Sequence, residues 1–289
     1  MRGIRPPGRD ARARDRDTAH VERTELLRTL DAYLDVAPRV ASRVETLGPF
    51  TVFVGTGAWP YYARPTPGRG LAVSAESVAA VCARQRELDT AVALEWVVEL
   101  APGLSDAAAE VGLGCNAMPL LVLEHALPAV VVPGVSTRVL AADDPALPAA
   151  VAAVEVGFGT PGTAQGVGGV AERDAAVDAV HAGLEFRRGL IRDGHLVMVA
   201  AETEAGPIAG GSVVPRGAVA ELAGIATLPA WRRRGVGAMV TAALTHAAAA
   251  VGVETVFLSA GDEDVARVYE RVGFSRVGSV GEAAQASER

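Results

Sequence analysis

The stretch that decides the fold is residues 221–260, ELAGIATLPAWRRRGVGAMVTAALTHAAAAVGVETVFLSA. Residues 221–227 predict a β-strand that ends in a proline turn. An alanine-rich helix follows from Gly235, and residues 255–259 are almost entirely apolar, as in a strand buried on both faces. The order strand, crossover helix, strand predicts two parallel neighbouring strands.

The start of this helix has the features of an anion site. Its first backbone N–H groups lack helical partners, and Gly235 and Gly237 carry no side chains that would keep a ligand away. The positive end of the helix dipole and three arginines, Arg232, Arg233 and Arg234, add favourable charge. The sequence therefore predicts a site for phosphate or pyrophosphate at this turn.

Other phosphate-binding and catalytic motifs are excluded by their spacing. The dinucleotide fingerprint fails because its third small position is Val240, and no acidic residue ends the following strand. A P-loop is excluded because all 27 basic residues are Arg. The sequence has no G-x-S-x-G elbow, and its five His with Cys82 and Cys115 show no metal-ligand spacing. We expect no metal.

The remaining pattern resembles one family of enzymes. Residues 232–237, RRRGVG, resemble the [Q/R]-x-x-G-x-[G/A] acyl-CoA motif of the GCN5-related N-acetyltransferases (GNAT). Residues 227–229 resemble the strand exit before that motif, residues 262–269 the N-x-x-A-x-x-L-Y helix, and residues 273–274 the closing Gly-Phe. The resemblance covers about residues 137–280.

The resemblance implies a twisted mixed sheet whose fourth and fifth strands splay apart around acetyl-CoA, the expected co-substrate. It implies that the backbone of three strand residues, Ile225, Ala226 and Thr227, pairs with the pantetheine arm. It also implies that the pyrophosphate lies on the amides of residues Arg232, Arg233, Arg234, Gly235, Val236 and Gly237. Asp262 stands where the family has Asn, which puts a cofactor contact by this side chain in doubt.

Two residues are candidates for proton transfer between an amine, the thioester and the departing thiolate. Glu221 lies eleven residues before Arg232, a spacing at which several family members carry a general base; the alternative is a solvated or salt-bridged strand carboxylate. Tyr269 matches the family's thiolate-protonating Tyr in its offset from Gly273; the alternative is an aromatic at the edge of the core.

The organisation along the chain predicts an α/β protein with a mixed (α+β) sheet. We expect an acyl-CoA N-acyltransferase fold in the C-terminal half and a smaller α/β domain, resembling a degenerate copy of the same fold, in the N-terminal half. The expected segments are a disordered basic leader (1–20), an N-terminal domain (21–127), a linker (128–136), the acetyltransferase domain (137–280) and a tail (281–289).

Two further segments are ambiguous in sequence. Residues 157–169, GFGTPGTAQGVGG, contain six Gly and predict either a lid over a site or a disordered connection. Trp59, Pro60, Tyr61 and Tyr62 follow a predicted strand and form either the wall of a substrate pocket or a turn with core residues.

Composition excludes several classes of protein. The chain has 289 residues, a formal net charge of −7 and 50% hydrophobic residues, enough for two modest domains. No apolar run reaches the roughly 18 residues of a membrane helix, and the charged opening lacks the apolar stretch of a secretory signal. With two Cys and no disulfide-rich spacing, we expect a cytoplasmic protein without a membrane partner.

The predicted function is transfer of an acetyl group from acetyl-CoA to a primary amine, by direct attack in a ternary complex. The alternative is a non-catalytic acyl-CoA-binding sensor or regulatory module. The acceptor is a small-molecule or protein amine, and a homodimer is left open. We expect no nucleic-acid partner, because Asp10, Asp15 and Asp17 interrupt the arginines of the leader and no aromatic residue there can stack on a base.

Overall fold

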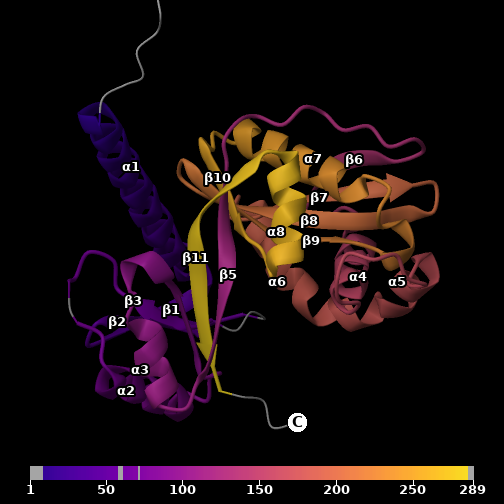
Figure 1. The fold of residues 1–289 in the computed structure, drawn as a ribbon. Coiled ribbons are helices and arrows are strands. Elements are labelled where there is room, and N and C mark those ends of the chain that lie inside the picture. The colour runs from indigo at the N-terminus through magenta and orange to yellow at the C-terminus, as the bar shows by residue number, and fades with distance from the viewer. Residues whose placement is uncertain (1–8, 58–60, 71, 286–289) are drawn as a thin grey trace, which may run out of the picture.

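The computed structural model describes residues 9–57, 61–70 and 72–285, with side chains from residue 20 onward. In this part of the chain, eleven strands form one mixed sheet in the order β1-β2-β3-β4-β11-β5-β10-β9-β8-β7-β6 (Figure 1). The strands are β1 Ser42–Leu47, β2 Phe50–Gly55, β3 Ala63–Pro65, β4 Ala93–Val97, β5 Gly114–Leu123, β6 Ser136–Leu140, β7 Val197–Thr203, β8 Gly206–Arg216, β9 Val219–Thr227, β10 Thr255–Ser259 and β11 Phe274–Ala284.

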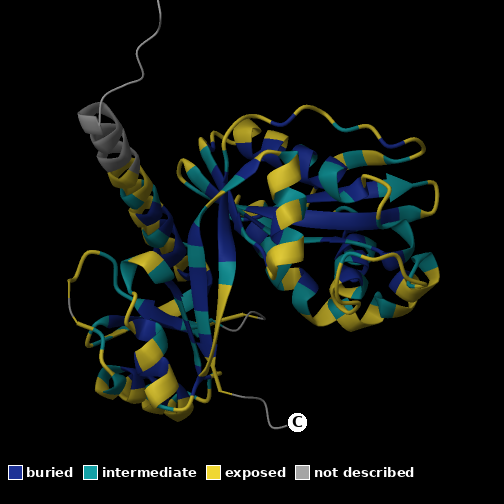
Figure 2. Cartoon of the chain, viewed as in Figure 1, coloured by how far each residue is buried: buried dark blue, intermediate teal, exposed yellow. Residues whose placement is uncertain are grey.

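Helices cover both faces of this sheet. They are α1 Arg9–Val36, α2 Ala75–Glu87, α3 Leu104–Glu110, α4 Leu147–Phe158, α5 Val170–Ala176, α6 His181–Arg192, α7 Val236–Ala250 and α8 Glu263–Val272. Short 3₁₀ helices lie at Ala37–Ala41, Val98–Leu100, Asp178–Val180 and Pro229–Trp231. Figure 2 shows the strands of the sheet as the most buried part of the molecule, with exposed residues on the outer faces of the helices.

Strand alternation divides the C-terminal half into two cores. On one face, Val240 and Leu244 of α7 pack with Val199 of β7 and with residues of β8 and β9. On the other face, Leu147 of α4 and residues of α6 pack with Met198 of the same strand β7. Successive side chains of β7 therefore point into different cores, as strand geometry requires. The strand pair β9 and β10 is parallel, as predicted.

The N-terminal half packs its helices on the same sheet. α2 and α3 cover one face, where Val78 and Leu104 contact Leu94 and Trp96 of β4. α1 lies on the other face and reaches the C-terminal half, where the Tyr33 ring meets the Phe257 ring of β10 edge to face, with centroids 4.9 Å apart. α1 thereby ties the two halves together.

One strand of the N-terminal half completes the sheet of the C-terminal half. β5 lies between β10 and β11 and is antiparallel to both. β11 pairs on its other side with β4. Figure 1 shows β5 and β11 as two long neighbouring strands that run from one half of the molecule into the other. The mixed α/β fold class is confirmed, and the two halves share a single sheet.

The structure differs from two of the expected segment boundaries. The predicted disordered leader is wrong for residues 9–20, which belong to α1; this stretch has no Gly or Pro, so the helix extends in front of Val21. Residues 1–8 lie outside the described residues. The predicted tail is wrong for residues 281–284, which lie in β11 and pair with both β4 and β5.

Candidate functional site

The candidate site lies where β9 and β10 part. Their paired register covers residues 219–221 and 255–257, after which β9 continues to Thr227. The register of β9 against β8 shifts in this stretch, and Gly224 takes a φ of +62°, so a bulge bends the strand. This bend turns the exit of β9 toward the start of α7.

A cavity of about 710 Å³ occupies this region. It is bounded by the exit of β9, the turn before α7, the helix α8 and the loop after α4. Its lining residues are Gly157, Phe158, Thr160, Pro161, Gly162, Thr163, Ile225, Ala226, Thr227, Arg232, Arg233, Gly235, Gly237, Ala238, Thr241, Gly261, Asp262, Val265, Val268, Tyr269 and Arg271. Nine of the twelve residues singled out in the sequence therefore line one cavity; Glu221, Arg234 and Val236 do not.

The start of α7 presents backbone donors to this cavity. Gly235 takes a φ of +84° at the N-cap, a left-handed conformation that favours glycine. The Met239 N–H donates to the Gly235 carbonyl at 3.0 Å, so the amides of residues 236–238 precede this first helical bond. A Cβ placed on Gly237 would meet only the Thr227 Oγ1 atom, at 3.9 Å. The glycine leaves a cradle open to a ligand.

Arg232 uses its guanidinium to hold the glycine-rich loop. It donates hydrogen bonds to the carbonyls of Gly157 at 2.6 Å, Thr160 at 2.8 Å and Ala164 at 3.3 Å, and burial lowers its pKa. The loop also bonds to the turn before α7, where the Ala230 N–H donates to the Gly168 carbonyl. Residues 157–169 were expected to be either a lid or a disordered connection; six of them, between Gly157 and Thr163, form a wall of the cavity.

The other motif residues take different positions. Arg233 lines the cavity in a left-handed conformation with a φ of +62°, which costs a non-glycine residue energy. The Arg234 guanidinium lies over the Trp231 ring, 4.8 Å from its centroid. Val236 is buried in the core beneath α7. Only the backbone of Val236 can serve a ligand, because its side chain supports the helix.

Asp262 and Tyr269 reach the cavity from α8. The Asp262 Oδ1 atom accepts a hydrogen bond from the Val265 N–H at 2.8 Å, so this side chain caps the helix. Asp caps a helix about as well as the Asn that the resemblance implies at this position. Burial raises the pKa of Tyr269 to about 12, and its ring meets Phe274 edge to face. Tyr269 thus keeps its proton at neutral pH.

Glu221 points away from this cavity, toward the N-terminal half. Its backbone N–H donates to the Tyr33 hydroxyl at 3.3 Å, which in turn donates to the Val214 carbonyl at 2.5 Å. The pKa of Glu221 is raised to about 8, chiefly by burial and also by the charge of Glu95, while the charge of Arg64 acts in the opposite direction. The carboxyl is therefore part of a network that crosses between the halves.

The residues of this network in the N-terminal half are absent from the sequence prediction, except for Tyr61 and Tyr62. The sequence held one signal that could have pointed to Glu95: it is the only charged residue in β4, whose other residues are apolar. Burial raises the pKa of both tyrosines; the charge of Glu95 raises that of Tyr62 further, and the charge of Arg216 opposes the rise at Tyr61. Both tyrosines thus lie at the junction of the halves. Trp59 and Pro60 lie outside the described residues.

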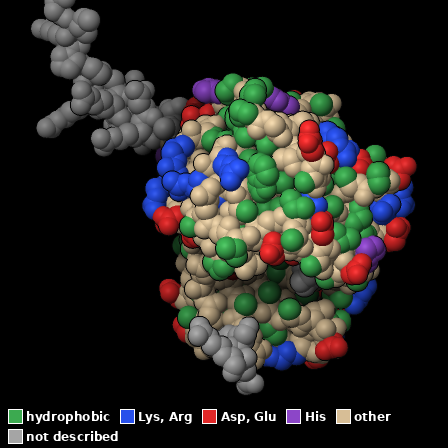
Figure 3. All heavy atoms as spheres, turned by 90° about the vertical axis from the view of Figure 1, so that its right-hand side faces the viewer, with side chains coloured by type: hydrophobic (Ala, Val, Ile, Leu, Met, Phe, Trp, Pro, Cys, Tyr) green, Lys and Arg blue, Asp and Glu red, His purple; other side chains and the backbone are tan. Residues whose placement is uncertain are grey.

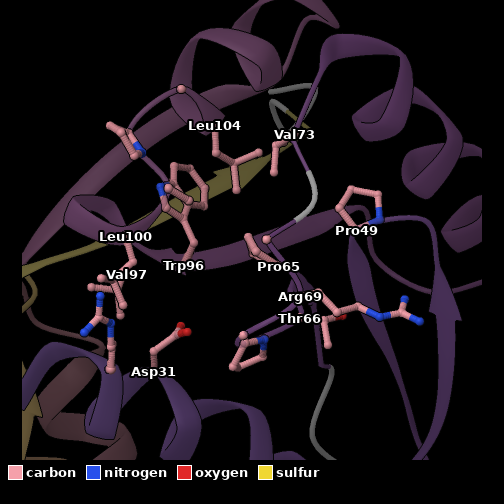
Figure 4. A pocket seen from close by; sticks show the side chains of 17 residues that line it. Asp31, Pro49, Pro65, Thr66, Arg69, Val73, Trp96, Val97, Leu100 and Leu104 are labelled. Carbon is pink, nitrogen blue, oxygen red and sulfur yellow. The ribbon is translucent and has the colours of Figure 1, made fainter. Parts of the chain in front are cut away.

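A second cavity, of about 580 Å³, lies in the N-terminal half (Figure 4). Asp31 of α1 and Trp96 of β4 line it together with Pro49 and Pro65. Within the described residues there is no cluster of three or more His, Cys, Asp and Glu side chains that could hold a metal ion. The described helices include none that is long and apolar enough to span a membrane.

Comparisons with known proteins agree with this geometry. Residues 171–274 match the family model of the acetyltransferase (GNAT) family. No curated protein matches the sequence. A GCN5-related N-acetyltransferase from Kribbella flavida is similar in structure, with a TM-score of 0.68 and 20% identity over 90% of this chain and 96% of that one.

Two further solved structures are similar over most of this chain. A tandem GNAT protein from the clavulanic acid biosynthesis pathway has a TM-score of 0.54 and 17% identity, covering 83% of this chain and 79% of its own. A GCN5-related N-acetyltransferase-like protein from Streptococcus suis has a TM-score of 0.53 and 9% identity, covering 86% and 92%. At these identities the likeness establishes the fold, and the matched family model covers most of the cavity.

Proposed function

We propose that this chain, whose residues 171–274 match the acetyltransferase (GNAT) family, transfers an acetyl group from acetyl-CoA to a primary amine by direct attack in a ternary complex. The observation that carries this proposal is the cavity where β9 and β10 part. Its wall combines the bent exit of β9, the glycine cradle of α7 and the Tyr269 hydroxyl-bearing ring.

The cavity residues fit the parts of acetyl-CoA. The backbone of Ile225, Ala226 and Thr227 would bind the pantetheine amides as an added strand would. The free amides at the start of α7 and the helix dipole would hold the pyrophosphate, and Arg233 supplies a positive charge at the cavity wall. Gly237 keeps open a space that a Cβ would otherwise occupy, between the backbone amides and the phosphate oxygens.

Two side chains would move the protons of the reaction. Glu221 would take a proton from the acceptor ammonium, leaving a neutral amine whose nitrogen forms a bond to the acetyl carbon. As the C–S bond breaks, Tyr269 would donate its proton to the sulfur, since its raised pKa keeps it protonated. The second proton that the nitrogen loses as the amide forms would restore the Tyr269 hydroxyl. Because Glu221 does not line the cavity, the proton of the acceptor ammonium would have to reach it through a water molecule.

The N-terminal half would limit which amines can reach the reaction site. It contributes β5 to the shared sheet and its own carboxyls to the surroundings of Glu221. The strand, helix, strand order from β4 to β5 supports a degenerate copy of the same fold, an arrangement suggested by the name of the tandem GNAT neighbour.

The test is a screen of the purified full chain with acetyl-CoA against a panel of primary amines, with release of CoA measured by chromatography. Chromatography is needed because the exposed Cys115 thiol would react with a thiol reagent. Amine-dependent release with a matching acetylated product supports the transferase. Binding of acetyl-CoA with no release for any amine would support the sensor instead, and no binding at all would contradict both.

A further inference from the structure

The second cavity belongs to the N-terminal half alone. Besides the hollow that Figure 3 shows between the upper and lower parts of the molecule, this cavity of about 580 Å³ lies within one half (Figure 4). Its lining residues fall between Arg28 and Leu104, and none of them lines the cavity at the start of α7. Its volume is in the range of sites for small molecules, so the N-terminal half has space for a ligand of its own.

Asp31 of α1 is the acidic side chain in the wall of this cavity. Its Oδ1 atom accepts a hydrogen bond at 2.5 Å from the Arg64 guanidinium, whose side chain is 0% exposed. This bond to a buried group fixes the direction of the carboxyl. Because a carboxylate can accept about four hydrogen bonds, Asp31 keeps capacity for a donor in the cavity.

The buried surroundings of Asp31 are one positive charge short. Arg64 faces a second carboxyl, since its Nη1 atom lies 3.9 Å from the Glu95 Oε1 atom. These two atoms are buried and have no hydrogen-bond partner among the described residues. Burial raises the pKa of both Asp31 and Glu95. An ammonium group beside Asp31 would therefore stabilise the ionised carboxyls.

Arg28 supplies the opposite charge next to Asp31. The two residues lie three positions apart on α1, with about 5 to 6 Å between their Cβ atoms, and both line the cavity. The ion pair of Arg28 with Glu25 spans 3.4 Å between side chains 65% and 72% exposed, so it holds Arg28 only weakly. Arg69 also lines the cavity, but it donates to the Gly48 carbonyl, and Figure 4 shows its guanidinium pointing away from Asp31.

Most of the remaining wall is apolar. Pro65 and Leu100 are half-buried, whereas Trp96 and Leu104 are almost completely buried. Figure 4 shows Trp96, Leu100 and Leu104 gathered on the same side of the cavity. A ligand held by its charges at α1 would thus meet an apolar surface with the rest of its body.

We propose that this cavity binds a free α-amino acid with an apolar or aromatic side chain. Its ammonium would donate to Asp31, and its carboxylate would accept from Arg28. Its side chain would pack against Leu100 and Pro65. The ammonium and carboxylate of such a ligand are adjacent, as are the two side chains on α1. The inference does not depend on the proposed acetyl transfer, because the two cavities share no lining residue.

The test is calorimetric titration of the full chain with L-phenylalanine, L-leucine and two analogues of phenylalanine that each lack one charge. Phenethylamine has no carboxylate, and hydrocinnamate has no ammonium. We expect L-phenylalanine to bind at least about tenfold more tightly than either analogue, because each analogue loses one charged hydrogen bond. Equal affinity for either analogue would overturn the inference, and so would the absence of binding by both amino acids at about 10 mM.

Two variants assign the charges to their residues. Arg28→Gln should weaken binding of L-phenylalanine at least about tenfold and leave phenethylamine unchanged, since this analogue has no carboxylate. Asp31→Asn should weaken phenethylamine and leave hydrocinnamate unchanged. Glu25→Gln, on the same helix but outside the cavity, is the matched control and should not weaken binding. Equal weakening of L-phenylalanine by Arg28→Gln and Glu25→Gln would contradict the role of Arg28.

Tryptophan fluorescence locates the bound amino acid. Trp96 lines the cavity and is one of three tryptophans in the chain. Binding of L-phenylalanine should change the emission, and Trp96→Phe should abolish this change; a change that persists would place the ligand elsewhere and overturn the inference. Asp31→Asn leaves the buried Arg64 without its charged partner, so circular dichroism must show that this variant folds. Arg28→Gln alters an exposed side chain and keeps the test decisive in either case.

Discussion

The Arg232 guanidinium donates a 2.6 Å hydrogen bond to the carbonyl of Gly157, so the first arginine of the motif is bound to the last turn of α4. Gly157 lets this turn lie close to β9, because a Cβ there would stand 2.8 Å from the Ala226 Cβ atom. The positive charge of Arg232 is thus used to hold a wall of the cavity. The proposed anion site therefore relies on the backbone amides at the start of α7 and on Arg233.

Replacement of Arg232 should loosen the glycine-rich loop. Arg232→Ala removes the hydrogen bonds to Gly157 and Thr160, and should lower the free energy of unfolding by about 2 kcal/mol. Arg232→Lys keeps the charge but lacks the planar fork, so it should recover only part of the loss. Denaturant unfolding measures both, with Arg234→Gln as a control that should cost about 1 kcal/mol or less. Equal losses for Arg232→Ala and Arg234→Gln would contradict this role.

The shared sheet predicts that the C-terminal half does not fold alone. A fragment of residues 130–289 lacks β5, which leaves the facing edges of β10 and β11 without a partner. We expect this fragment to aggregate or to show no cooperative thermal transition, while the full chain unfolds in one transition. Circular dichroism and light scattering provide the measurement. A fragment that unfolds cooperatively as a monomer would show that β5 is dispensable.

The sequence predicted the local elements of the site better than their long-range partners. The parallel pair β9 and β10, the helix between them and the turn at Gly235 follow from periodicity and glycine placement, which are local signals. The pairing of β5 with β10 and β11 joins residues about 135 to 170 positions apart, and no local pattern encodes it. The same limit applies to Glu221: the sequence placed it correctly on a strand, but it did not predict that residues of the N-terminal half surround its carboxyl.

Tyr269 should affect turnover without affecting binding. Tyr269→Phe keeps the ring against Phe274 but removes the proton donor, so kcat should fall by about 10²- to 10⁴-fold while the Kd for acetyl-CoA stays near the wild type. Because burial raises the pKa of Tyr269 to about 12, its ionisation should not lower activity below about pH 10. Steady-state kinetics from pH 6 to 10 with the best amine test both points. Normal turnover in the variant would leave Tyr269 as a packing residue only.

The central claim is that the cradle at the start of α7 holds acetyl-CoA, and calorimetric titration of acetyl-CoA into Gly237→Val tests it most directly. Gly237 has helical backbone and open space at its Cβ, so the variant should fold at least as well as the wild type. Gly189→Ala, in α6 and also with open space at its Cβ, is the matched control outside the cavity. We predict at least about tenfold weaker binding for Gly237→Val, about 1.4 kcal/mol, and unchanged binding for Gly189→Ala. Wild-type affinity in folded Gly237→Val would contradict the assignment of the cradle.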